Sequence, residues 1–453
     1  MNAVVSFQTT RTPWFRGPAA LLVVACLVAG CSVAVATSSP SAGPTSSPQP
    51  SATTQTLPSP SESVTPGEIP SVGPAPAGRW IGIRWISAGA VFPQEPVAGT
   101  DNGSFLQVKV FGWSRGFVGF RNAIDETYSQ TGQIVSEKDV MVSTASTDGI
   151  HWSPGRDLDL TGLGSTVSIT GVAEGPAGLL AVGRFPRGVC GGPPTVDVLW
   201  ASPDGLTWTH VPLPADFASS SVYTLDAGSS GYIATGILKD GVTAAVWVST
   251  DGRSWHRAPL PKTTSGTVLV DGATAFAGGF VLSGAQQIQV GCGESVQVPS
   301  VWGSADAKSW TAPKLPGAIP SDSTWVDVAR ISDHAVMATA WLWNATSQAS
   351  SQLVWATGNG RTWTPLEWPA SLLRATVLTD GQRGLAFADP TSDSTGPTIA
   401  TIDDDLTVTT LTQSGDIPTG AAIGGSTFAF GPSGVVVLTN NGLNLWLGVP
   451  TAS

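Results

Sequence analysis

The stretch Val246-Trp247-Val248-Ser249-Thr250-Asp251-Gly252-Arg253-Ser254-Trp255 recurs along the chain and sets its plan. Its Asp-Gly pair stands between two apolar segments, which is a strong β-hairpin signal because the turn needs a positive φ that Asp and Gly tolerate. Two further copies and two degenerate ones also end on tryptophan: Ser146–Trp152, Ser202–Trp208, Ser304–Trp310 and Thr357–Trp363. The sequence therefore predicts one such hairpin in each repeating unit.

A second signature is an apolar run, usually opened by glycine, that recurs through the same region. Its seven copies are Gly116–Gly119, Gly178–Gly183, Gly231–Gly236, Gly279–Gly284, Ala335–Ala340, Gly384–Ala388 and Gly434–Leu438. They follow one another about every 50 residues, a period typical of solenoids and propellers. Each unit reads as four short strands without the 3.6-residue periodicity of a helical solenoid. We predict an all-β protein, a β-propeller of seven four-stranded blades.

The weak sixth unit leaves six or eight blades as alternatives, because Asp403-Asp404-Asp405 replaces the motif there. The ends of the repeat region suggest how the ring closes. The last unit shows three strands before the chain stops, whereas Arg79–Ile86 is a strand without a unit of its own. We expect this N-terminal strand to pair into the last blade, because closure leaves only short, protected edges. The propeller domain would then span residues 79–450.

Composition excludes some classes of function. The net charge is −11 and only 12% of the residues are charged. Nucleic-acid binding needs clustered lysine and arginine, so an acidic chain argues against it. After the N-terminal segment, no stretch is long and apolar enough to span a bilayer.

The N-terminal segment has the pattern of an export signal. Arg11 and Arg16 precede the short apolar run Ala19–Val28, as in a signal peptide. The run ends in Leu27-Val28-Ala29-Gly30-Cys31, which resembles the lipobox of bacterial lipoproteins. The resemblance implies that residues 1–30 are removed and that Cys31 is lipidated, which anchors the exported protein at the outer face of the cell membrane. An ordinary cleaved signal peptide is the alternative.

Residues 31–78 are expected to form a tether. From Ser32 to Gly78 the sequence is dominated by Ser, Thr, Pro, Ala and Gly, with only Glu62 and Glu68 charged. Such a composition buries too little apolar surface to offset the entropy of ordering. We therefore predict a disordered stalk.

The hairpin motif has a structural explanation for each residue type. The Asp carboxylate can accept hydrogen bonds from turn N–H groups, and the closing Trp covers the apolar gap between neighbouring blades. The motif resembles the Asp-box, or BNR repeat, of sialidase-like propellers, Ser-x-Asp-x-Gly-x-x-Trp, with the residue between Asp and Gly missing here. In that family the boxes are structural turns away from the active site. The resemblance assigns this role to Asp148, Trp152, Asp204, Trp208, Asp251, Trp255, Asp306, Trp310, Asn359 and Trp363.

The resemblance to sialidases also implies a set of catalytic residues, and the sequence lacks its signs. That site needs an arginine triad, a tyrosine nucleophile with a glutamate partner, and an aspartic acid, and the family carries a Phe/Tyr-Arg-Ile-Pro motif that does not occur after Gly78. We assign no catalytic residue, no metal ligand and no cofactor. A candidate ligand loop, with a plain solvated loop as the alternative, contains Arg121, Asp125, Glu126 and Tyr128.

Two cysteines fall in loops between second and third strands, Cys190 in unit two and Cys292 in unit four. Exported proteins are oxidised, so we expect a disulfide between them, with two free thiols as the alternative. Long loops at Arg121–Asp139 and Leu342–Leu353 occupy the equivalent position. Together these loops should form one elaborated face, where propellers usually bind their ligands.

The sequence thus predicts a monomeric, membrane-anchored module that binds or scaffolds without catalysis. Its ligand would be a glycan, a cell-wall component or a protein. A sialidase-like glycan hydrolase and an assembly factor for a membrane complex are the alternatives.

Overall fold

A computed structural model defines the fold over fifteen described segments. These are residues 78–89, 91–92, 108–128, 134–160, 167–184, 197–214, 217, 220–263, 266–290, 295–316, 323–344, 349–388, 397–418, 427–439 and 444–452. Their secondary structure consists of β-strands and one short 3₁₀ turn, η1 (Ala370–Leu372). Among these residues no helix is long and apolar enough to cross a membrane.

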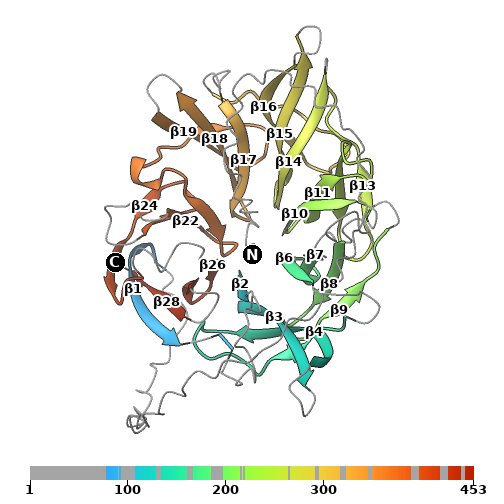
Figure 1. Cartoon of the computed structure of the whole chain (residues 1–453). Coiled ribbons are helices and arrows are strands. Elements are labelled where there is room, and N and C mark those ends of the chain that lie inside the picture. Colours follow the sequence, from blue (N-terminus) through green and yellow to red (C-terminus); the bar gives the residue numbers. More distant parts are fainter. Residues whose placement is uncertain are drawn as a thin grey trace, which may run out of the picture. The chain divides into compact units, whose positions relative to one another are not determined.

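Seven sheets follow one another around a ring, which confirms the predicted seven-bladed β-propeller (Figure 1). We number the blades I to VII in chain order. Blade I contains β2 (Val108–Trp113), β3 (Gly116–Tyr128), β4 (Ile134–Ser146) and β5 (Arg156–Asp157). Blade II contains β6 (Ser168–Gly175), β7 (Gly178–Arg184), β8 (Asp197–Ser202) and β9 (Thr209–Val211). Blade III contains β10 (Ser221–Gly228), β11 (Gly231–Ile237), β12 (Ala244–Ser249) and β13 (His256–Ala258).

In the second half of the ring, blades IV and VII depart from the four-stranded pattern. Blade IV contains β14 (Thr267–Phe276), β15 (Gly279–Gln289) and β16 (Ser295–Ser304), with the single bridge Gly303–Thr311 at its outer edge. Blade V contains β17 (Ser323–Ser332), β18 (Ala335–Asn344), β19 (Ala349–Thr357) and β20 (Thr364–Pro365). Blade VI contains β21 (Thr376–Thr379), β22 (Gly384–Ala388), β23 (Thr398–Ile402) and β24 (Val408–Thr410). Blade VII contains β26 (Thr427–Gly431), β27 (Gly434–Thr439), β28 (Asn444–Ala452), β1 (Trp80–Gly89) and β25 (Thr412–Gly415).

The apolar core lies between blades. Each of seven buried clusters draws its side chains from two neighbouring blades, and one of them joins blade VII to blade I. Every residue of β12 is buried, because both faces of this strand are covered by neighbouring blades. That is why the middle strands read as continuous apolar runs in the sequence.

The N-terminal strand closes the ring as predicted. β1 pairs antiparallel with β28, for example Ile83 with Pro450 and Trp85 with Gly448. Its other edge pairs parallel with β25, with Gly82 opposite Thr412. β25 comes directly after the outer strand of blade VI and makes blade VII five-stranded, a feature that the sequence did not indicate.

Two segments predicted as loops are largely β-hairpins. Within Arg121–Asp139, β3 continues to Tyr128 and β4 starts at Ile134, and within Leu342–Leu353, β18 continues to Asn344 and β19 starts at Ala349. In each case the second and third strands go on pairing beyond the body of the blade. Cross-strand pairing satisfies backbone donors and acceptors that a loop would leave to water.

Candidate functional site

The two ends of the propeller carry different connections between strands. In an antiparallel blade the turns from first to second strand and from third to fourth strand lie at one end, which we call the turn face. The hairpins from second to third strand and the connections between blades lie at the other end, the loop face. The Asp-containing hairpins of the sequence repeat are turns from third to fourth strand, so they all lie on the turn face.

The turn around Asp251 shows the geometry of these hairpins. Oδ1 of Asp251 accepts hydrogen bonds from the main-chain N–H groups of Arg253 at 2.8 Å and Ser254 at 2.6 Å. Gly252 has a φ of 68°, and its carbonyl accepts the indole N–H of Trp255 at 3.1 Å. Equivalent main-chain contacts are made by Asp148, Asp204, Asp306 and Asn359.

The closing tryptophans differ in burial. Trp208, Trp255 and Trp363 are buried and each packs between its own blade and the preceding one. Trp152 and Trp310 are half-buried. In the fourth copy Ala307 stands where the other copies have glycine, with a φ of 56°, and the indole N–H of Trp310 binds the carbonyl of Pro259 at 2.7 Å. All ten residues thus lie at hairpin turns.

Replacing Asp251 with alanine should lower the free energy of unfolding by about 1–2 kcal/mol, by analogy with the loss of a helix cap. Main-chain N–H hydrogen bonds hold the pKa of Asp251 well below its usual range. A carboxyl with a lowered folded-state pKa contributes stability above the unfolded pKa of about 4, and that contribution is lost as the pH falls further. Urea denaturation at pH 7 and pH 3 should therefore show the difference between variant and wild type shrinking at the lower pH. Asp251→Asn, which keeps the accepting oxygen as Asn359 does, should be milder; equal effects of the two variants would contradict this interpretation.

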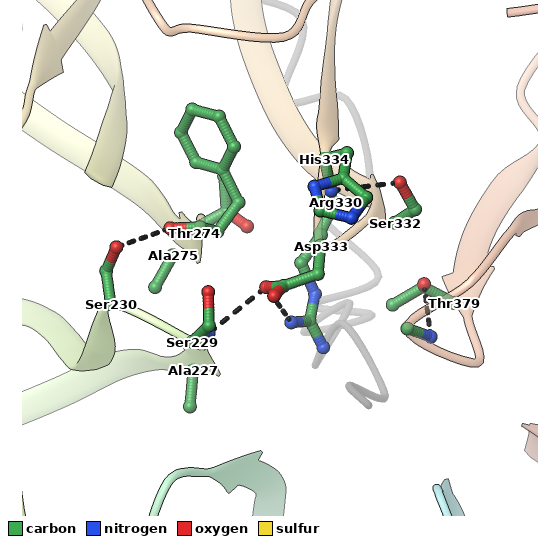
Figure 2. Close-up of polar contacts among 12 residues, drawn as sticks. Ala227, Ser229, Ser230, Thr274, Ala275, Arg330, Ser332, Asp333, His334 and Thr379 are labelled. Carbon is green, nitrogen blue, oxygen red and sulfur yellow. Dashed lines mark hydrogen bonds and ion pairs between the residues drawn. The ribbon is translucent and has the colours of Figure 1, made fainter. Parts of the chain in front are cut away.

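A polar network lies at the first turns of several blades on the turn face (Figure 2). It links the first turns of blades III to VI. Asp333 accepts the N–H of Ser229 on its carboxylate at 3.1 Å and the N–H of Ala277 on its carbonyl at 2.7 Å. Its own N–H donates to the carbonyl of Gly381 at 2.9 Å. One residue of blade V therefore touches three other blades.

Arg330 lies at the centre of this network and is only 2% exposed. Its Nη1 lies 3.5 Å from Oδ1 of Asp333, while Nε and Nη2 have no partner among the described residues. Asp226 of blade III is also buried and accepts the hydroxyl of Thr274 at 2.5 Å. Burial raises the pKa of Asp226, and the positive charge of Arg330 opposes that rise. The network ties these blades together through hydrogen bonds, since its carboxylates accept them from neighbouring blades.

The loop face of blade V carries an exposed aromatic row. Trp325 on β17, Trp341 on β18 and Gln352 on β19 stand directly opposite one another across three strands. The two indole rings are 6.4 Å apart between centroids and tilted by 36°, and Trp325 is 46% exposed. Its indole N–H donates to Oδ2 of Asp327 at 3.1 Å, which fixes the ring's orientation.

A small hollow between blades I and II lies on the same face. It is lined by Lys109, Phe120, Asn122, Ser168 and Ile169. The Lys109 ammonium donates to the carbonyl of Ile169 at 2.9 Å, and burial lowers the pKa of Lys109. The Asn122 amide donates to the carbonyl of Val167 at 2.6 Å. Both side chains therefore form hydrogen bonds from blade I to main-chain carbonyls at the start of blade II.

The candidate ligand loop is placed on the β3–β4 hairpin. Arg121 stacks its guanidinium 5.0 Å from the centroid of the Phe92 ring. In the backbone register of the hairpin, Asp125 stands opposite Lys138, Glu126 opposite Glu137, and Tyr128 opposite Ile134. These residues therefore belong to strands rather than to a mobile loop.

Other predicted positions lie outside the described residues. These are Cys31, Cys190 and Cys292, so the lipid anchor and the disulfide remain predictions. Over the part of the chain that the structure describes, no group of three or more His, Cys, Asp or Glu side chains could hold a metal ion.

The aromatic row and the Arg330 network were both missed by sequence reasoning. A signal for the row was available in Trp341 and Trp343, two tryptophans at alternating positions after a run of buried residues. Arg330 has no comparable signal, because Asp226 precedes it by more than two repeating units.

Comparisons with known proteins found weak similarity to solved structures. No family model and no curated protein matches the chain. Among solved structures, a protein of unknown function from Dyadobacter fermentans is 12% identical, with a TM-score of 0.39, over 82% of this chain and 100% of its own. The β-propeller domain of the Trilobed protease from Pyrococcus furiosus is 8% identical, with a TM-score of 0.41, over 78% of this chain and 96% of its own. Sucrose-6-phosphate hydrolase from Lactobacillus gasseri is 13% identical, with a TM-score of 0.29, over 81% of this chain and 88% of its own.

Proposed function

We propose that this chain is an exported lipoprotein, anchored through Cys31 at the outer face of the cell membrane, whose Asp-box-type propeller is a non-catalytic binding module. The location of its exposed apolar side chains carries the proposal. Seven large hydrophobic side chains are exposed among the described residues, and Ile81 on β1 is one of them. The other six lie on the loop face: Val242, Val290, Val296, Val298, Trp325 and Leu373. We take their location on one face as the sign of an interaction surface there.

The point at which the predicted tether would join the propeller also supports a binding surface on the loop face. Arg79, at the start of β1, forms ion pairs with Asp403 at 2.9 Å and Asp405 at 3.0 Å. The Arg383 guanidinium donates to the carbonyl of Gly78 at 3.4 Å. These partners belong to the first and last turns of blade VI, on the turn face. A tether that reaches Gly78 would join the turn face and leave the opposite loop face accessible to a ligand.

The contacts of the two network carboxylates, Asp226 and Asp333, favour a structural role for them over catalysis. The buried carboxylate of Asp226 is held by a hydroxyl and by main-chain N–H groups. The carboxylate of Asp333 is likewise held by Ser229 and Arg330. A general acid or base must instead reach a proton on the substrate. The Phe/Tyr-Arg-Ile-Pro motif of sialidases does not occur after Gly78.

Co-sedimentation of the full chain carrying Cys31→Ser with isolated cell envelopes tests the proposal, because this variant reports on the propeller without the lipid. We expect it to sediment with envelopes, and we expect Val290→Ser/Val296→Ser/Val298→Ser to reduce the bound fraction several-fold. A matched triple variant on the turn face, Arg253→Ser/Lys308→Ser/Arg361→Ser, should bind normally. In parallel, the unsubstituted chain should enter the detergent phase on phase separation and the Cys31→Ser chain should not. Robust turnover of fluorogenic glycosides, or equal binding by the two triple variants, would overturn the proposal.

A further inference from the structure

Blade V rises above blade VI on the loop face. The Thr379 hydroxyl of blade VI donates to the carbonyl of Ile331 of blade V at 2.6 Å, which fixes the relative height of their first strands. β21 begins at Thr376, three residues from this contact, whereas Trp325 lies six residues from it. The aromatic row is therefore displaced by about three residues, or roughly 10 Å, beyond the first residue of β21. The first strand of blade VI therefore does not reach the level of Trp325.

The row combines aromatic surface with amide hydrogen-bonding groups. The exposed indole of Trp325 is held in place by Asp327 and backed by Trp341. Next to Trp341 stands Gln352, whose Oε1 accepts the N–H of Arg374 at 3.2 Å. Its amide nitrogen carries two donors for an outside acceptor. The three side chains of the row bear no charge.

This combination matches the chemistry of a sugar ring. A pyranose has an apolar face of C–H bonds, which packs against an aromatic ring, and a rim of hydroxyl groups, which pair with amides. The net charge of −11 disfavours an acidic polymer through long-range repulsion. A neutral sugar therefore fits the row better than an acidic one.

We propose that Trp325, Trp341 and Gln352 form a subsite for a pyranose residue of a neutral polysaccharide, with the sugar stacked on Trp325. This inference rests on the proposed binding function and gives it a ligand class. The stacked ring would leave the sugar's rim accessible to Gln352.

Affinity electrophoresis of the full chain with Cys31→Ser, in gels containing a β-glucan, a mannan or a galactan, tests this subsite. We expect retardation by at least one of these neutral polymers, and a loss of affinity of about tenfold or more in Trp325→Ala. Trp325→Phe keeps a stacking ring and should retain most of the affinity. Ile81→Ala, at an exposed apolar position on β1 that lies outside the loop face, is the matched control and should bind like the unsubstituted chain. Unchanged thermal unfolding of Trp325→Ala would show that the fold is intact.

The outcomes separate this inference from the proposed function. Retardation that is equal for Trp325→Ala and the unsubstituted chain would overturn the subsite and leave a binding module standing. Failure to bind any neutral polymer, with envelope binding still lost in the loop-face triple variant, would overturn the sugar class and point to a protein ligand. Hydrolysis of the polymers would overturn the proposed function itself.

Discussion

Replacing Arg330 with methionine is expected to lower the free energy of unfolding by about 1–3 kcal/mol, because the buried carboxylate of Asp226 loses a compensating positive charge. Arg330 and Asp226 are both buried, and Arg330 supplies the positive charge that offsets the burial of the Asp226 carboxylate. Without it, Asp226 keeps its hydrogen bonds but loses its charge compensation. Asp333, which touches blades III, IV and VI, loses its positively charged neighbour but keeps its main-chain hydrogen bonds. Urea denaturation at neutral pH measures the loss.

Two comparisons isolate the electrostatic part of this effect. Arg361→Met, at an exposed position on the turn face, should change the stability by less than about 0.5 kcal/mol. Asp226→Asn combined with Arg330→Met should be less destabilised than the sum of the two single variants. A loss below about 1 kcal/mol for Arg330→Met would contradict the proposed tie.

The pH dependence of the Arg330→Met variant provides a further check on the same tie. Burial raises the pKa of Asp226 in the folded protein above its ordinary value. A carboxyl with a raised folded-state pKa binds a proton more readily when folded, so stability increases as the pH falls through that pKa. Loss of Arg330 should raise the pKa further. The stability difference between variant and wild type should therefore shrink as the pH is lowered from about 8 to about 5.

Local signals explain how much of the fold the sequence could predict. The hairpin at Asp251-Gly252 is encoded by adjacent residues, because the turn, its glycine and its closing tryptophan lie within one short motif. Closure by β1 was also predictable, since a strand without a blade and a blade lacking a strand could be counted. In both cases the prediction required no knowledge of contacts between blades.

The rest depends on contacts between distant parts of the chain. β25 pairs with β1 across more than 300 residues, and its short sequence Thr412–Gly415 has no apolar alternation to indicate a strand. The height of Trp325 relative to the neighbouring blade VI is not encoded by any local pattern. Arg330 likewise gains its role from Asp226 two blades away. The sequence therefore predicted which face of the propeller carries the candidate site, but it did not predict the individual residues of that site.

Replacing Trp85 with alanine should lower the free energy of unfolding by about 3–5 kcal/mol, as for other buried large aromatic residues. Trp85 is 1% exposed and packs in the cluster between blades VI and VII. Its indole N–H donates to the side chain of Gln413 at 2.9 Å. Because β1 is the only described strand that joins the two ends of the propeller sequence, its loss should open the ring at blade VII.

The expected signature is local as well as global. Limited proteolysis followed by mass spectrometry should show cleavage within β1 earlier in Trp85→Ala than in the wild type, since a strand that detaches exposes its backbone. Ile81→Ala is the matched control, because Ile81 lies in the same strand but is 45% exposed; it should leave both stability and cleavage nearly unchanged. If Trp85→Ala lost stability without early cleavage in β1, Trp85 would act as an ordinary core residue and the closure would rest on the backbone pairing of β1 with β28. If neither changed, the closing strand would contribute far less to the ring than its burial implies.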